Sequence, residues 1–221
     1  MKIVSFTGIG RRNRNEDAYA VVEMPEQGRT LAIVCDGMGG HGYGDEASQT
    51  VVKAISNYWT GNPKRHDSEK KIVDAVAQAG IIYEKKTCGR EMGATLTMVA
   101  IEDGTVHFCH CGDSRIYFCR KSGMRFYTND HTRVSEEGWV LVTNCFFTGH
   151  CSEIKPDIRS FKLEEGDRIM LCSDGVYGSV DKDEMWAILK SNASIENVAK
   201  RFEDICAGVS SDNYTAVIIE N

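Results

Sequence analysis

The sequence has little proline and no long hydrophobic run. Only three prolines occur in 221 residues, and no stretch rich in proline, serine or glycine divides the chain. No segment approaches the roughly 18 consecutive apolar residues of a membrane-spanning helix. Since there is also no internal repeat, we expect a single domain over residues 1–221.

Positive charge is also scarce. The formal net charge is -6 at pH 7, which argues against a general nucleic-acid binder or a protein of anionic membrane surfaces. The N-terminal segment 1–7 is too short for a signal peptide and is soon followed by Arg11 and Arg12. We therefore expect a cytoplasmic protein that binds neither nucleic acid nor membrane.

Cysteine, in contrast, is frequent. The nine cysteines are an odd number, and most lie inside apolar, strand-like segments, where a reduced thiol packs as a small core side chain. A disulfide framework would leave one cysteine unpaired and is typical of smaller secreted chains. We expect reduced thiols.

The hydrophobic pattern predicts an α+β protein. Hairpins outnumber strand–helix–strand units, which favours antiparallel sheets with helices packed outside. Helices are predicted at 46–59, at about 67–86, and from near 181 and 194; strands are predicted at 2–7, 18–23, 31–35, 94–101, 105–111, 115–120, 124–128, 158–163, 168–172 and 214–219, with 130–157 irregular.

One stretch organises the rest of the chain. The apolar run 31–35 leads directly into Asp36, and glycines follow at 37, 39 and 40. This pattern is typical of a buried strand that ends in a tight turn. Glycines let the backbone approach a ligand closely, so Asp36 and nearby carbonyl groups could hold a divalent cation. A turn that Asp36 merely caps is the simpler alternative.

The same construction recurs, and this favours the metal site. Acidic residues at the predicted ends of other apolar strands are Glu16, Asp17, Asp113, Asp174 and Asp212. Carboxylates gathered at one sheet edge would repel one another unless cations neutralised them. Oxygen ligands without an assembled set of His or Cys select Mg²⁺ or Mn²⁺ over zinc. Two such ions can activate a water and clamp a phosphoryl group.

Arg12 lies four residues before Glu16, in the same polar loop. Its guanidinium could bind phosphate oxygens in a bidentate manner. An ordinary solvated arginine explains the spacing equally well, so the pattern alone leaves both interpretations open.

Seven segments, in order along the chain, together resemble the metal-dependent protein serine/threonine phosphatases of type 2C (the PPM family), in their bacterial-like branch. They are Arg12-Asn13-Arg14-Asn15-Glu16-Asp17-Ala18, Asp36-Gly37-Met38-Gly39-Gly40, Gly93-Ala94-Thr95-Leu96, Gly112-Asp113-Ser114-Arg115, Asn129-Asp130-His131-Thr132, Ser173-Asp174-Gly175-Val176 and Asp212-Asn213-Tyr214-Thr215.

The resemblance implies a four-layer αββα sandwich, with two central antiparallel sheets flanked by pairs of helices. It also implies hydrolysis of phosphoserine and phosphothreonine in proteins by a hydroxide that bridges two Mg²⁺ or Mn²⁺ ions, without a phosphoenzyme. The expected partners are phosphorylated proteins, among them a Ser/Thr kinase and its substrates, with the chain acting as a monomer.

Roles carry over from the resemblance residue by residue. Asp36 would bridge both ions and, with Arg12 on the substrate phosphate, form the catalytic pair. The remaining assignments are Asp174 and Asp212 on the first ion, Glu16 and the Gly37 carbonyl on the second, Asp113 with Asp174 on a weaker third, and Asp17 and Asn213 in support of these ligands.

Two positions depart from the family pattern. Met38 stands where some members carry a histidine that could protonate the leaving group, which leaves metal-bound water as the preferred donor and His41 as an alternative. The region at about 131–157 is short for the flap that usually overhangs the cleft.

Three alternatives stay open. Cys109 and Arg115 match the Cys-x5-Arg spacing of cysteine-dependent phosphatases, although the segment alternates like a strand. His107, Cys109, His110 and Cys111 could be interpreted as a zinc cluster, although a strand would point His110 away from the other three. A catalytically inactive pseudophosphatase that binds phosphoproteins is the non-enzymatic alternative.

Overall fold

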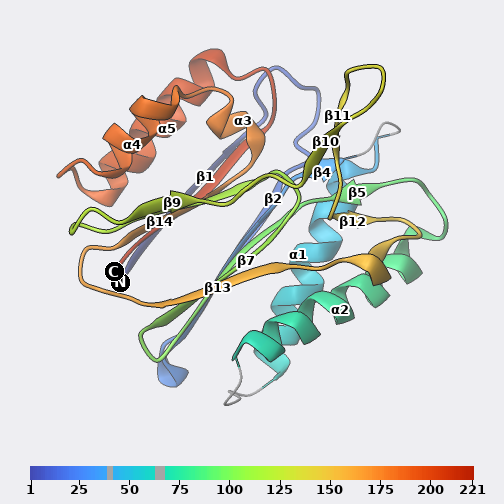
Figure 1. The fold of residues 1–221 in the computed structure, drawn as a ribbon, viewed down its shortest axis with the longest axis horizontal. Coiled ribbons are helices and arrows are strands. Elements are labelled where there is room, and N and C mark those ends of the chain that lie inside the picture. Colours follow the sequence, from blue (N-terminus) through green and yellow to red (C-terminus); the bar gives the residue numbers. More distant parts are fainter. Residues whose placement is uncertain (39–41, 63–67) are drawn as a thin grey trace.

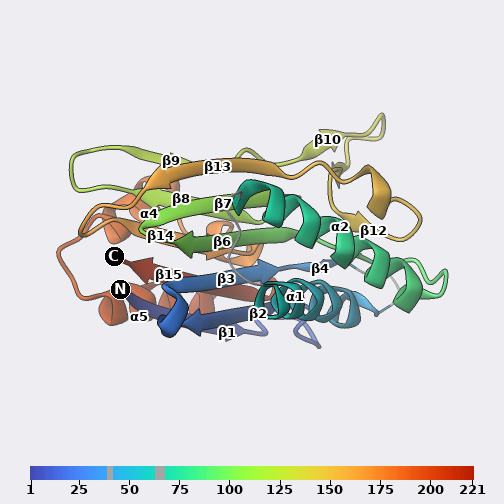
Figure 2. The same cartoon turned by 90° about the horizontal axis from the view of Figure 1, so that it is seen from below.

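The computed structural model describes residues 1–38, 42–62 and 68–221, and folds them into four layers (Figures 1 and 2). Two five-stranded antiparallel sheets form the centre. The first has the order β1 (Lys2–Gly8), β15 (Tyr214–Glu220), β14 (Arg168–Cys172), β8 (Arg115–Cys119) and β9 (Arg125–Tyr127). The second has the order β13 (Asp157–Lys162), β7 (Thr105–Cys111), β6 (Leu96–Glu102), β3 (Arg29–Cys35) and β2 (Ala18–Met24).

Helices cover the outer face of each sheet, as Figure 1 shows. The second sheet packs against α1 (Gly44–Gly61) and α2 (Ser68–Thr87). The first packs against α4 (Lys182–Leu189) and α5 (Ile195–Val209), with the single turn α3 (Asp174–Tyr177) nearby. The predicted αββα sandwich is confirmed. Within the described ranges, no helix combines the length and the apolar character needed to cross a membrane.

Three cores separate the four layers, and this explains why the central strands are apolar on both faces. In β3, Leu31 and Ile33 point toward α1 and α2, whereas Ala32 and Val34 pack between the two sheets. The strand is therefore fully buried, and its side chains cannot alternate with polar ones. The acidic residue that follows such a strand is held from behind by packing.

Both chain ends lie at one end of the first sheet (Figure 1). Strands β1 and β15 are antiparallel neighbours, with Lys2 opposite Glu220 and Gly8 opposite Tyr214. The other ends of these strands lead into the loops that carry Arg12 and Asp212.

Several element predictions need correction. The strand expected at 94–101 is two strands, β5 (Gly93–Ala94) and β6, interrupted at Thr95. The turn α3 was not expected. The predicted irregular region contains β10 (Thr132–Val134), β11 (Val140–Val142), β12 (Phe146–Phe147) and the 3₁₀ turn Cys151–Glu153. These pieces are two to three residues long, too short to produce a readable hydrophobic period.

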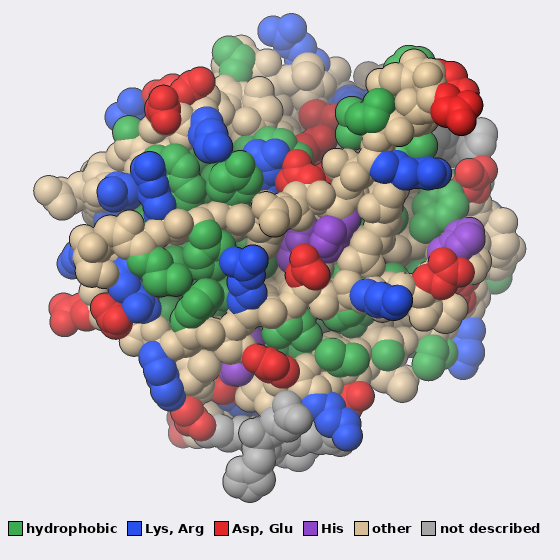
Figure 3. Space-filling view, viewed as in Figure 1, with side chains coloured by type: hydrophobic (Ala, Val, Ile, Leu, Met, Phe, Trp, Pro, Cys, Tyr) green, Lys and Arg blue, Asp and Glu red, His purple; other side chains and the backbone are tan. Residues whose placement is uncertain are grey.

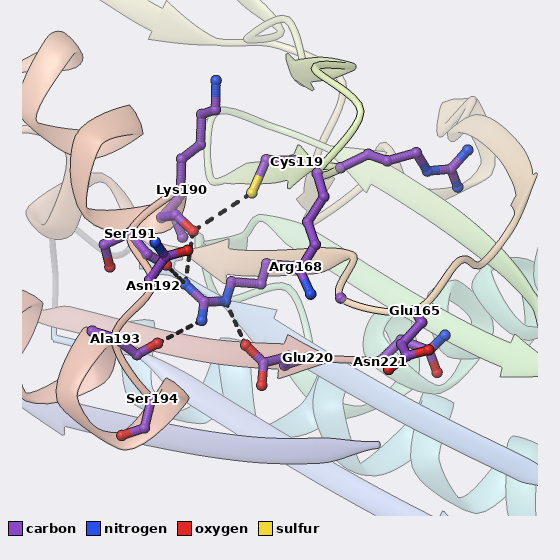
Figure 4. Close-up of a pocket in the computed structure, with 14 residues that line it drawn as sticks. Cys119, Glu165, Arg168, Lys190, Ser191, Asn192, Ala193, Ser194, Glu220 and Asn221 are labelled. Atoms are coloured by element: carbon purple, nitrogen blue, oxygen red, sulfur yellow. Dashed lines mark hydrogen bonds and ion pairs between the residues drawn. The ribbon is translucent and has the colours of Figure 1, made fainter.

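A buried arginine anchors the helix layer over the first sheet (Figure 4). Arg168 donates from Nε to Glu220 Oε2 at 2.6 Å. Its Nη1 donates to the Leu189 and Ser191 carbonyls at 3.0 and 2.7 Å, and Nη2 to the Ala193 carbonyl at 2.6 Å. These carbonyls lie at the last residue of α4 and in the segment that follows it, where no further helical turn supplies N–H donors. Arg168 therefore fixes the end of α4 to the sheet.

Replacing Arg168 with methionine should lower the free energy of unfolding by about 3 kcal/mol, because Glu220 loses its partner and three carbonyls lose their donors. Urea denaturation measures this change. Arg201→Met is the matched control, since Arg201 is mostly exposed and pairs with the partly exposed Glu184. We expect less than about 1 kcal/mol there. Equal losses in the two variants would contradict the anchoring role.

Candidate metal centre

The predicted ligands line one cavity of about 560 Å³. We call it the carboxylate cavity. Its walls are formed by Arg12, Asn13, Arg14, Glu16, Asp36, Gly37, Met38, Asp113, Val142, Asp174, Asp212 and Asn213. Every residue predicted to bind a metal or the substrate phosphate is among them, although these residues come from five separate segments. Asp17 lies behind the wall, and His41 falls outside the described residues.

Asp36 is fixed by backbone contacts rather than by its own side chain. It lies between β3 and the short strand β4 (Gly37–Met38). Its N–H donates to Thr95 Oγ1 at 2.9 Å, and its carbonyl accepts from the Thr95 N–H at 2.9 Å. Thr95 Oγ1 in turn lies 2.7 Å from Ser114 Oγ. The break between β5 and β6 thus places Thr95 where it orients Asp36.

The loop that carries Glu16 is tied to Asn213. Asn213 Oδ1 accepts from the Glu16 N–H at 2.8 Å, and its amide nitrogen donates to the Ile9 and Arg14 carbonyls at 2.9 and 2.8 Å. Ser48 Oγ, from α1, donates to the Glu16 carbonyl at 2.6 Å. One side chain at the start of β15 therefore sets the path of the loop between β1 and β2.

Close backbone approach requires glycine on the other wall. A Cβ on Gly37 would lie 2.0 Å from the Gly44 carbonyl oxygen, and a Cβ on Gly44 would lie 2.7 Å from the Glu16 carboxyl carbon. The turn after Asp36 and the start of α1 can meet beside Glu16 only because Gly37 and Gly44 have no side chains.

The carboxylates are crowded and raise one another's pKa. Burial, and then the Asp17 and Asp174 carboxylates, raise the pKa of Asp36 well above its usual value. Burial is also the main cause that raises the pKa of Asp17 and of Asp113 to about 6. The pKa of Asp174 is raised by burial and then by Asp212. The protein alone therefore disfavours the charged forms of these groups.

Two buried carboxylate oxygens in this cluster have no hydrogen-bond partner among the described residues. They are Oδ1 of Asp174 and Oδ1 of Asp17; the other oxygen of Asp17 accepts from Ser173 Oγ at 2.7 Å. Unsatisfied buried oxygens are costly unless a cation or donor reaches them. Carboxylate oxygens with a nearby backbone carbonyl are the ligands that Mg²⁺ and Mn²⁺ prefer, so the residues present fit such ions.

Arg12 lies at the mouth of the cavity. Its Nη2 is 2.5 Å from Asp212 Oδ2, and its side chain is 59% exposed. The hydrogen bond to Asp212 is the main cause that raises the pKa of Arg12. A guanidinium held at the rim in this way can reach both a cavity carboxylate and an incoming anion.

The cysteine-phosphatase alternative does not fit this structure. Cys109 is fully buried in the core beneath α1 and α2. Arg115 is bidentate to Asp130, with Nε to Oδ1 at 2.8 Å and Nη2 to Oδ2 at 2.7 Å. Neither a reactive thiol nor a free guanidinium is present at this spacing.

The zinc alternative also fails, because the four residues do not converge. Cys109 and Cys111 face the helices, and His107 Nδ1 pairs with Ser160 Oγ at 2.8 Å. The ring of His110 lies against the ring of His131, with centroids 4.6 Å apart. Figure 3, which is viewed in the same direction as Figure 1, shows histidine side chains in purple near the middle of the molecular surface.

His110, His131 and Asp157 do come close enough to hold a metal ion. However, the Gly112 N–H and the Asn144 amide both donate to His131 Nδ1, at 3.2 and 3.3 Å. The proton of a neutral His131 is therefore on Nε2, which lies 3.1 Å from Asp157 Oδ2. No lone pair of His131 is left for a cation. We interpret His131 and Asp157 as a hydrogen-bonded support for the loop after β9, against which the His110 ring packs without a hydrogen bond among the described residues.

A family model for protein phosphatase 2C matches residues 8–209 of the sequence. The chain belongs to the protein phosphatase 2C family. The phosphatase PhpP of Streptococcus pneumoniae is 28% identical to this type 2C chain, over 99% of the chain and 97% of PhpP.

Solved structures agree with this fold. A serine/threonine phosphatase of S. agalactiae has a TM-score of 0.85 at 24% identity and covers 100% of this chain and 99% of its own. PstP is a serine/threonine protein phosphatase of Mycobacterium tuberculosis. The catalytic domain of PstP, in complex with 2 manganese ions, has a TM-score of 0.79 at 26% identity and covers 99% of this chain and 97% of that one.

Thr95, Ser114 and Ser173 lie in segments that match the family pattern, but the sequence pattern assigned no role to these three residues. Each is a small hydroxyl residue one or two positions from an acidic residue or a glycine. That placement is a usable signal, because Ser and Thr side chains often bond to nearby backbone or carboxyl groups. Which acidic residue each hydroxyl holds depends on the fold, so the pairing could not be predicted.

In a metal-free solution with chelator, Asp36→Asn should raise the free energy of unfolding of this type 2C phosphatase by about 1–3 kcal/mol, because it removes one crowded, buried charge. The matched control is Asp130→Asn. Asp130 pairs with Arg115, so its loss should destabilise the fold instead. Urea denaturation in EDTA gives both values, and destabilisation by Asp36→Asn would contradict the crowding.

Stability should fall between pH 6.5 and 4 partly because of His110. Burial, and then His131, lower its pKa to about 4, whereas an unfolded histidine has a pKa of about 6.5. Between these values the unfolded chain binds a proton that the folded one does not. Stability is therefore lost as pH falls, by at most about 3 kcal/mol. His110→Phe should flatten this part of the unfolding profile, whereas substitution of the exposed His150 by glutamine should leave it unchanged.

Proposed function

We propose that this chain is a Mg²⁺- or Mn²⁺-dependent serine/threonine protein phosphatase that hydrolyses phosphoserine and phosphothreonine in proteins. The carboxylate cavity carries the proposal, because its crowded acids include a buried oxygen that lacks a partner. PhpP is a protein phosphatase, PstP and the S. agalactiae protein are serine/threonine phosphatases, and the PstP catalytic domain holds manganese. These likenesses support the same activity here.

The arrangement of the cavity supports the ligand roles inferred from the resemblance. Asp36 lines the cavity together with Asp174, Asp113 and Asp212, and besides burial the carboxylates of all three contribute to its raised pKa. We assign Asp36 as the shared ligand of two ions, Asp174 and Asp212 to one ion, and Glu16 with the Gly37 carbonyl to the other. When bound, such ions would lower the pKa of a water that attacks phosphorus and would neutralise charge on the phosphoryl group.

A weaker third ion would depend on Asp113 together with Asp174. Asp113 faces the same cavity, and the Asp174 carboxylate contributes to its raised pKa. Asp17 and Asn213 act through their neighbours. The first accepts from Ser173 beside Asp174, and the second holds the Glu16 backbone.

Arg12 would bind the substrate phosphate from the rim. Its guanidinium offers several donors, of which Asp212 uses one in this structure. Transfer of this contact to a phosphoryl oxygen would orient the substrate above Asp36. The segment 131–157 contributes Val142 to the wall, and we propose that it acts as a short flap beside the cleft. A Ser/Thr kinase and its phosphorylated targets are the proposed substrates.

The purified chain should hydrolyse p-nitrophenyl phosphate and phosphothreonine peptides with Mn²⁺, lose this activity in EDTA, and keep it after iodoacetamide. Asp174→Asn should reduce kcat/KM by about 100-fold or more, because an amide cannot replace a charged metal ligand. Steady-state kinetics measures both effects.

The matched control is Asp183→Asn, the same substitution at an exposed position in the first turn of α4. Its activity should equal that of the unaltered chain. If the unaltered chain binds phosphopeptides but does not hydrolyse them at any Mn²⁺ or Mg²⁺ concentration, the phosphatase assignment is wrong and the binding-module alternative replaces it.

A further inference from the structure

The loop between β1 and β2 carries three arginines that differ in where they point. Arg11, Arg12 and Arg14 are all exposed. Arg12 and Arg14 line the carboxylate cavity, whereas Arg11 does not. Two arginine side chains therefore lie at the rim of the same cavity, and only one of them is needed to bind the reacting phosphate.

Arg14 differs from Arg12 in its partners. Within the part of the chain that the structure describes, its side chain makes one hydrogen bond, a long contact of 3.5 Å from Nη1 to the Gly42 carbonyl, and no ion pair. Arg12, two residues earlier, is bound to Asp212. Arg14 thus lacks a carboxylate partner although acidic residues surround the cavity that it lines.

The base of Arg14 is nevertheless held firmly. Its carbonyl accepts from the Asn213 amide at 2.8 Å, and the same Asn213 side chain accepts from the Glu16 N–H. The loop backbone is thereby fixed beside a predicted metal ligand while the guanidinium stays available. The backbone part of the ordering that ligand binding would require of this residue is already present in the fold, and only the side chain has still to be ordered.

We propose that Arg14 is a specificity-determining residue that binds a second anionic group of the substrate, beside the phosphoserine or phosphothreonine that is hydrolysed. The inference rests on the proposed phosphatase function. The group is an oxyanion, either a second phosphate or an Asp or Glu carboxylate, because a guanidinium binds both in a bidentate manner.

The reach of the side chain limits where this second group lies. An extended peptide advances about 3.5 Å per residue, so side chains one to three positions from the phosphorylated residue lie about 4–10 Å from it. Arg12 and Arg14 line one cavity of about 560 Å³, so a peptide that places its phosphate at Arg12 can bring a nearby side chain to Arg14. We expect the selected group within three residues of the reacting phosphate.

The test is a panel of phosphothreonine peptides that differ only at flanking positions. One peptide has neutral flanks, one carries a flanking glutamate, and one carries a non-hydrolysable phosphonate analogue of phosphoserine. The unaltered enzyme should show a kcat/KM about tenfold higher for the anionic peptides, mainly through a lower KM. The ratio between the phosphonate and glutamate peptides identifies which oxyanion Arg14 prefers.

Arg14→Ala should bring the ratio of kcat/KM for the anionic peptides to kcat/KM for the neutral peptide close to one. Arg14→Lys should restore part of the ratio, because a lysine keeps the charge but not the bidentate fork. Arg11→Ala is the matched control, since it removes the same charge from the same loop outside the cavity, and it should keep the full ratio. Circular dichroism and thermal unfolding verify that each variant is folded.

The possible failures are distinct. Absence of hydrolysis of p-nitrophenyl phosphate and of every peptide by the unaltered chain refutes the phosphatase function itself. Hydrolysis without a preference for anionic flanks supports the phosphatase function but contradicts the proposed role of Arg14. A preference that survives in Arg14→Ala, or that Arg11→Ala abolishes equally, also overturns it, because the selection would then belong to the loop charge in general.

Discussion

Mutual repulsion among carboxylates is the constraint on which this structure depends. Asp36, Asp113 and Asp174 converge on one partly buried cavity, and each has a raised pKa because of burial and of its acidic neighbours. A fold gains no stability from such an arrangement, so the rest of the molecule must hold it in place. Stability is given up at the site for the ability to bind cations, as is common where proteins carry out chemistry.

The four layers provide that support. The acidic residues lie at the ends of strands whose two faces are both buried, so the packing of three cores fixes where each strand ends. Hydrogen bonds of Thr95, Ser173 and Asn213 then fix the positions of Asp36, Asp17 and Glu16 within the cluster. Because these contacts join segments that are far apart in the sequence, the site forms only when both sheets have packed together.

Much of this could be predicted from the sequence, because its patterns are local. Continuous apolar runs indicated buried strands, and the Asp103-Gly104 pair indicated a hairpin; both residues indeed have positive φ, 50° and 67°. The acidic residues at strand ends were found in the same way. The break at Thr95 could not be predicted, because it depends on pairing with Asp36 across the sheet. The ion pair of Arg115 with Asp130 likewise depends on a contact that no spacing rule encodes.

The pairing of β1 with β15 has a practical consequence for engineering. Both chain ends emerge side by side at one end of the first sheet, and β1 separates them from the loop that carries Arg12 by about 20 Å. A tag, a fluorescent protein or a targeting module joined to either end would leave the cavity accessible. The same proximity means that a short peptide could link the two ends, so that a circularly permuted enzyme could be opened at a distant turn.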